Sequence, residues 1–142
     1  LKYFVYLIIY RLFMTCFWSG ILQALDDNDF KFLGKKKMLR HDFVNFLKEN
    51  NKLTVNVRWN GEDISKQEMK ENYNGVNNFD VKRITNGHPC GTCDLFLLLI
   101  CELFYVDIEH YYLNNKMVYR NVKGSRKMLR FRSDFRHFWC DC

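Results

Sequence analysis

Cys16 and His137, near opposite ends of the chain, are residue types that can work together as a thiol nucleophile and its base. Cys16 opens a short apolar run that continues to Leu25. A helix N-terminus carries a partial positive charge and unpaired backbone N–H groups, which stabilise a thiolate placed there. A histidine can accept the thiol proton. The pair therefore indicates nucleophilic catalysis, although a single cysteine is more often a small buried hydrophobe.

Two predicted elements must hold this pair in place. Apolar residues recur at helical spacing from Phe17 to Leu25, so residues 16–25 are expected to form a helix that docks on a core. Near the other end, residues 128–132 alternate like a strand, and a loop over 133–136 delivers His137. Trp18 is interpreted as a core residue, and His41 and His110 as structural or exposed ones.

The remaining patterns predict an α+β fold, with a central buried helix against a small antiparallel sheet. Residues 95–105 are apolar almost all round, with Thr92 as the expected cap and Asp94 in the first turn. Further helices are expected over 39–50 and 66–72, where Asn74-Gly75 ends the second one. Strands are expected over 53–59, 106–112 and 117–119, whereas 30–37 and 76–87 are interpreted as connectors, the second with a brief strand at 81–84.

Length and composition favour one domain that spans residues 1–142. The apolar content is 48% and the formal charge is +6, which permits an anionic partner without establishing one. Six cysteines in a chain of this apolar content are expected to be reduced, as in the cytoplasm, or in the host cytoplasm if this Asn- and Lys-rich chain is viral. Residues 1–13 are interpreted as a strand or an upstream segment, because Arg11 ends the apolar run too early for a membrane span.

Three motifs in this order resemble those of the ovarian-tumour (OTU) class of cysteine proteases, which remove ubiquitin and related modifiers from proteins. The motifs are Cys16-Phe17-Trp18 with its helix, Gly91-Thr92-Cys93-Asp94-Leu95 before the central helix, and Leu129-Arg130-Phe131 followed by His137-Phe138-Trp139. They span nearly the whole chain, and Leu39-Arg40 at the start of the second helix is also similar. The resemblance implies an OTU-like fold and a thiol peptidase that needs no cofactor or metal and acts on ubiquitin or a ubiquitin-like protein, with no nucleic acid or membrane as partner.

The resemblance also implies roles for individual residues. Cys16 is the nucleophile and His137 the general base, and the backbone N–H groups of Met14, Thr15 and Cys16 form the oxyanion hole. His88, Gly91 and Trp139 border the substrate channel, although His88 is equally well interpreted as a solvated loop histidine. The chain departs from the family at two positions. Phe13 stands where an aspartate usually precedes the cysteine, and Trp139 stands where Asn or Asp often follows the histidine. The acid that orients His137 is therefore open between Asp134 and Asp141.

Two other interpretations of the same residues remain. The missing acid favours a catalytically inactive interaction module of OTU shape. Alternatively, the thiolates of Cys90, Cys93, Cys140 and Cys142 could hold zinc in a basic nucleic-acid-binding module, with Arg126, Lys127, Arg130, Arg132 and Arg136 as its cations. The one-residue spacing of Cys140 and Cys142 is short for a structural zinc site, so we expect no zinc at these four cysteines.

Overall fold

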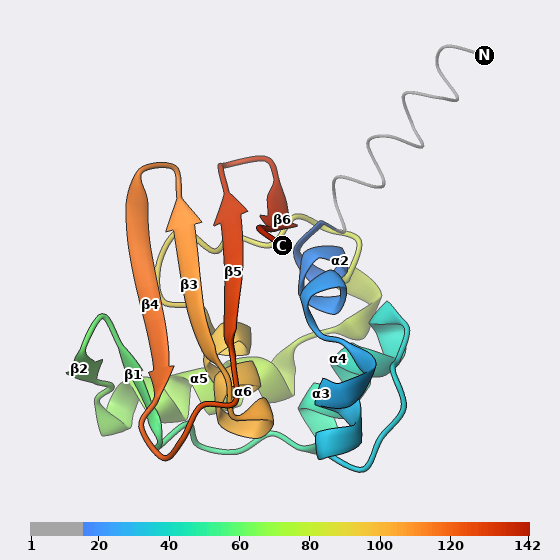
Figure 1. The fold of residues 1–142 in the computed structure, drawn as a ribbon, viewed down its shortest axis with the longest axis horizontal. Coiled ribbons are helices and arrows are strands. Elements are labelled where there is room, and N and C mark those ends of the chain that lie inside the picture. The colour runs from blue at the N-terminus through green and yellow to red at the C-terminus, as the bar shows by residue number, and fades with distance from the viewer. Residues whose placement is uncertain (1–15) are drawn as a thin grey trace.

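The computed structural model describes residues 16–142, and for Cys16 it describes the backbone alone. Over this range the fold is α+β, with helices packed against a six-stranded mixed sheet (Figure 1). The helices are α2 (Cys16–Ala24), α3 (Asp27–Phe32), α4 (Arg40–Glu49), α5 (Lys66–Asn78), the 3-10 helix η1 (Val81–Arg83) and α6 (Leu95–Phe104). The strands are β1 (Val57–Trp59), β2 (Glu62–Asp63), β3 (Asp107–Tyr112), β4 (Asn115–Asn121), β5 (Met128–Ser133) and β6 (Phe138–Cys140).

The sheet has the order β2-β1-β4-β3-β5-β6, and its strands are not all antiparallel as the sequence predicted. β3 and β5 pair in parallel, whereas every other neighbouring pair is antiparallel. The link between β4 and β5 is attached to the residues just before β3. The backbone N–H of Arg126 donates to the carbonyl of Tyr105, and its Nε donates to the carbonyl of Phe104. These bonds hold the link across the start of β3, so that β5 begins on the side of β3 opposite β4 and runs parallel to β3.

Helix α6 lies at the centre of the core, as its apolar sequence predicts. Eight of its ten residues are buried, from Phe96 to Phe104. The predicted cap is wrong by two residues, because Asp94 and not Thr92 is the N-cap. Its Oδ1 accepts the N–H groups of Phe96 and Leu97, at 2.9 and 3.0 Å. This carboxylate satisfies two of the N–H groups that a helix start leaves unpaired.

Helix α2 packs against α6 on one side and against the last strand, β6, on another. Trp18 is 2% exposed and packs edge-on against Phe96, so its interpretation as a core residue is confirmed. On another side of α2, a Cβ at Gly20 would lie 2.9 Å from the ring of Phe138 on β6. The small residue therefore permits the close approach of α2 and β6, which lie side by side in Figure 1.

Several local predictions need correction. Gly75 does not end α5, which runs on to Asn78, and a Cβ at Gly75 would come within 3.0 Å of Leu95, so the glycine lets α5 approach α6. Residues 81–83 form a 3-10 helix instead of a strand. The first residues of the expected connector at 30–37 belong to helix α3, which starts at Asp27 because Asp26 and Asp29 form a capping box. Within 53–59 only residues 57–59 form a strand, and β6 was not predicted.

The predictions for residues 1–13 concern a part of the chain that the structure does not describe. Within residues 16–142, no helix has both the length and the apolar character that crossing a membrane requires.

Candidate functional site

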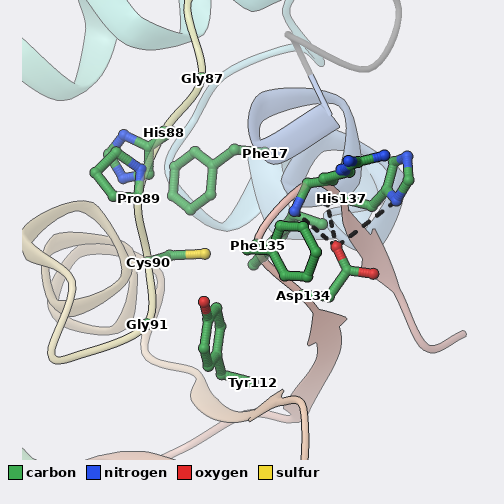
Figure 2. A pocket seen from close by; sticks show the side chains of 12 residues that line it. Phe17, Gly87, His88, Pro89, Cys90, Gly91, Tyr112, Asp134, Phe135 and His137 are labelled. Carbon is green, nitrogen blue, oxygen red and sulfur yellow. Dashed lines mark hydrogen bonds and ion pairs between the residues drawn. The ribbon is translucent and has the colours of Figure 1, made fainter.

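A cavity of about 410 Å³ opens where the head of α2, the loop before α6 and the loop before β6 meet (Figure 2). Phe17 lines it from α2, His88 and Gly91 line it from the loop before α6, and Asp134 and His137 line it from the loop after β5. Segments that are far apart in the sequence therefore meet at one cavity. The sequence singled out both loops and the helix head as parts of a site.

Asp134 and His137 face one another across a tight turn. His137 Nδ1 lies 3.7 Å from Asp134 Oδ1, which also accepts the backbone N–H groups of Arg136 at 2.7 Å and His137 at 2.8 Å. These backbone donors, together with the nearby imidazole, hold the pKa of Asp134 below its usual value. The carboxylate is thus ionised at neutral pH and lies beside Nδ1 of the ring.

Asp141, the other candidate acid, lies elsewhere. Its Oδ2 accepts a hydrogen bond from Arg132 Nε at 2.8 Å, and its backbone N–H donates to the carbonyl of Arg130. Of the two acids that the sequence left open, the structure therefore brings only Asp134 to the imidazole of His137.

His88, which lines the cavity, pairs with the buried Asp94. His88 Nε2 lies 2.5 Å from Asp94 Oδ2, and the two side chains are 12% and 2% exposed. The His88 ring stacks on Phe17 with the centroids 3.9 Å apart. Asp94 thus caps α6 with one oxygen and holds His88 with the other, and His88 in turn supports the first turn of α2. It is not the solvated loop histidine that the sequence also allowed.

Gly91 and Trp139 have different positions relative to the cavity. A Cβ at Gly91 would lie 3.2 Å from the ring of Tyr112, so the glycine lets the loop pass close to the end of β3. Trp139 does not line the cavity, since strand alternation turns it to the opposite side of β6 from the buried Phe138, where it is 42% exposed. The expected channel role thus fits the position of Gly91 and not that of Trp139.

The proposed nucleophile stands at the edge of the described region. Helix α2 begins at Cys16, and the next residue, Phe17, lines the cavity. The side chain of Cys16 lies outside the described part of the chain, as do Met14 and Thr15. The distance from the thiol to His137 is therefore still a prediction.

No family model, curated protein or solved structure matches the chain.

The cysteines other than Cys16 do not come together as a metal site. Cys140 and Cys142 form a disulfide, which differs from the expected reduced state and occupies both sulfurs. Burial raises the pKa of Cys93 to about 12, which disfavours its thiolate. Within residues 16–142, no three His, Cys, Asp or Glu side chains gather as metal ligands would.

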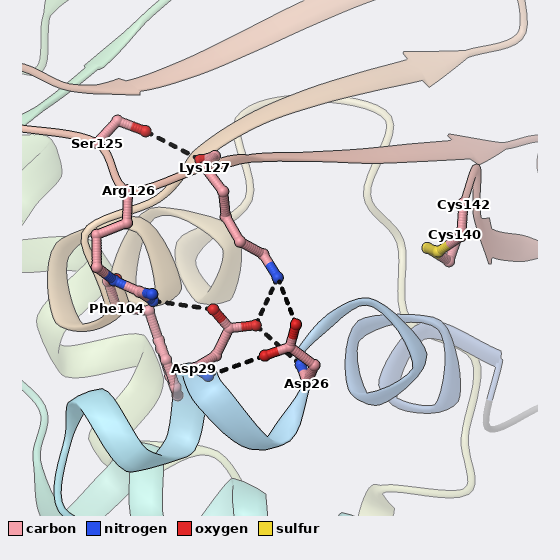
Figure 3. Close-up of polar contacts among 8 residues, drawn as sticks. All are labelled: Asp26, Asp29, Phe104, Ser125, Arg126, Lys127, Cys140 and Cys142. Carbon is pink, nitrogen blue, oxygen red and sulfur yellow. Dashed lines mark hydrogen bonds and ion pairs between the residues drawn. A yellow bond between two sulfur atoms is a disulfide. The ribbon is translucent and has the colours of Figure 1, made fainter.

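Two of the basic residues assigned to a nucleic-acid-binding module have a structural role instead (Figure 3). Arg126 Nη2 lies 3.0 Å from Asp29 Oδ1, and Lys127 Nζ lies 2.7 Å from Asp29 Oδ2. Asp29 is only 1% exposed. These cations balance a buried carboxylate and join α3 to the start of β5.

One polar group near the cavity was not predicted as part of a site. His110 on β3 is fully buried, and its Nε2 lies 2.6 Å from the hydroxyl of Ser133. That hydroxyl lies 3.9 Å from Cys90 Sγ, and Cys90 lines the cavity. Alternation in 106–112 puts residue 110 on the same face as Ile108, which is a sequence signal for burial that was available.

Proposed function

We propose that the chain is a cysteine peptidase of OTU type that hydrolyses peptide or isopeptide bonds of ubiquitin or a ubiquitin-like protein. Cys16 is its nucleophile, His137 its general base and Asp134 the acid that orients the base. The observation that carries the proposal is that His137, paired with Asp134, lines the same cavity as Phe17, the residue that follows Cys16 at the head of α2. The OTU-like fold is part of this proposal.

The proposed reaction passes through a thioester between Cys16 and the substrate. His137 takes the proton of the Cys16 thiol, and the thiolate attacks the carbonyl carbon of the scissile bond. Backbone N–H groups of Met14, Thr15 and Cys16 stabilise the oxyanion that forms. His137 then gives the proton to the leaving amine as the C–N bond breaks. Water, deprotonated by the same imidazole, hydrolyses the thioester and restores the thiol.

The acid supports this chemistry through the imidazole. A carboxylate beside Nδ1 favours the tautomer with its proton on Nδ1, so that Nε2 is the nitrogen that accepts a proton. The separation of 3.7 Å is longer than a hydrogen bond. Catalytic contacts are often long before substrate binds and shorten in the complex. This position supports Asp134 as the orienting acid, a role that neither Phe13 nor Trp139 can fill.

The test is cleavage of di-ubiquitin, and reaction with a ubiquitin probe that traps a reactive thiol. Cys16→Ala should abolish both, and His137→Ala should come close to doing so. Because nucleophile and base act as one unit, the double variant should be hardly slower than either single variant. Circular dichroism checks that each variant folds. Full cleavage by folded Cys16→Ala rejects the mechanism, and an unreactive wild-type protein favours the inactive module.

A further inference from the structure

One face of the sheet points away from α6 and carries exposed and half-buried side chains. On β4, β3, β5 and β6, core residues alternate with residues that are exposed or half-buried. The strand register sets four of the outward residues side by side in one row across these strands. The row runs Lys116, Tyr111, Arg132, Trp139, each a backbone partner of the next.

Cations and aromatic rings therefore alternate along this row. The guanidinium of Arg132 lies 4.8 Å from the centroid of the Tyr111 ring, and Lys116 Nζ lies 5.9 Å from it. Trp139 is 42% exposed at the end of the row. Neighbouring strands are ~4.8 Å apart, so the two aromatic residues stand roughly 10 Å from each other with Arg132 between them.

The same face is positively charged beyond this row. Arg58 and Arg120 are partners on β1 and β4, and Arg130 lies next to Arg132 on the outward side of β5. Carboxylates offset part of this charge, since Glu109 contacts Lys116 and Arg130, Asp141 contacts Arg132, and Asp63 contacts Arg58. Asp107, at the outward position that begins β3, is a fourth carboxylate, and its Oδ1 accepts the backbone N–H of Asn121. Five cations thus face four carboxylates. Exposed ion pairs of this kind are weak, so a phosphate can replace the carboxylate.

We propose that this face binds single-stranded nucleic acid, with bases stacked on Tyr111 and Trp139 and phosphates on the cations beside them. Single strands suit such a surface because their bases are free to stack, whereas those of a duplex are stacked within it. An acidic protein segment could also form ion pairs with the cations, but its carboxylates would not stack on the aromatic rings between them. This binding is independent of the proposed peptidase activity, and it differs from the sequence-based expectation of no nucleic acid because the row exists only through the sheet register.

The experiment measures fluorescence anisotropy of a labelled oligouridylate and of the matching oligodeoxythymidylate, with the full chain. Both should bind saturably, and binding should weaken as salt rises, because each phosphate contact releases counterions. A preference for one of them identifies RNA or DNA as the favoured source. Trp139→Ala should weaken binding by about five-fold or more, since that is the lower range of one base–aromatic stack. Trp139→Phe should restore most of it.

Matched variants separate the proposal from a general attraction of opposite charges. Arg132→Gln should weaken binding, whereas Lys70→Gln, which removes an equal charge from exposed α5, should leave it unchanged. The proposal is wrong if the wild-type chain shows no saturable binding at low salt. It is equally wrong if Trp139→Ala binds as tightly as wild type, or if polyglutamate competes as well as an unlabelled oligonucleotide. Circular dichroism confirms that the variants compared are folded.

Discussion

Replacing the buried His110 should change how the stability of this fold depends on pH. The ring is fully buried on β3, with Nε2 at the Ser133 hydroxyl, and within the described structure its Nδ1 has no hydrogen-bond partner. Burial lowers the pKa of His110 from 6.5 to about 4, against a smaller opposing effect from the charge of Asp94. The folded state therefore keeps this imidazole neutral at a pH where the unfolded chain protonates it.

The sign and size of the effect follow from this difference. Above pH 6.5 both states are neutral at His110, so the full stability is present there. As the pH falls, the unfolded state binds the proton first, so the free energy of unfolding decreases until the folded pKa of about 4 is reached. A difference of about 2.5 pKa units corresponds to a loss of about 3 kcal/mol at the acid limit, and to about 2 kcal/mol at pH 5.

The assay is urea unfolding of wild type and His110→Gln between pH 7.5 and pH 5. Glutamine can keep a hydrogen bond to Ser133 but cannot take up a proton in this range. The difference in unfolding free energy, wild type minus variant, should fall by about 2 kcal/mol over this interval, while other titrating groups cancel. A difference that stays constant with pH would refute the reasoning. Titration of the His110 ring by NMR gives the same answer without a variant.

Three further substitutions test the site and its supports. Asp134→Ala should reduce di-ubiquitin cleavage by ten-fold or more without unfolding the protein, whereas Asp141→Ala should not, since of these two acids only Asp134 lies near His137. The reverse result would identify Asp141 as the orienting acid. Asp29→Asn should lower the free energy of unfolding by about 3 kcal/mol in a urea titration, because two cations lose a buried partner. Asp27→Asn, at an exposed position of the same helix, is the control, and equal effects of the two substitutions would contradict the structural role of Asp29. Gly20→Ala should lower the melting temperature despite the better helix propensity of alanine, because the new methyl group meets the Phe138 ring; an unchanged or higher melting temperature would show that the ring yields.

Periodicity predicted the helices and strands whose apolar residues recur regularly. It failed where contacts between distant segments determine the end of a helix or the pairing of strands. Helix α6 and strands β3 to β5 were recognisable because apolar spacing records burial directly. Gly75 is a local stop signal, but packing against Leu95 keeps α5 helical beyond it. The parallel pairing of β3 with β5 depends on how the Arg126 turn attaches to Tyr105 and Phe104. No local pattern encodes that attachment.

The candidate site shows the same division between residue type and placement. The sequence named His137 and two possible acids, but their separations in sequence are similar, three residues and four. The distinction comes from the fold, because β6 pairs with β5 and carries Asp141 to Arg132, while the turn before β6 folds Asp134 back onto the His137 backbone. His88 was equally open between loop and site, and its burial with Asp94 depends on the cap of α6 and on the Phe17 ring. Residue types thus predicted which chemistry was available. Strand pairing and helix capping determined which of these side chains lie close enough to act together.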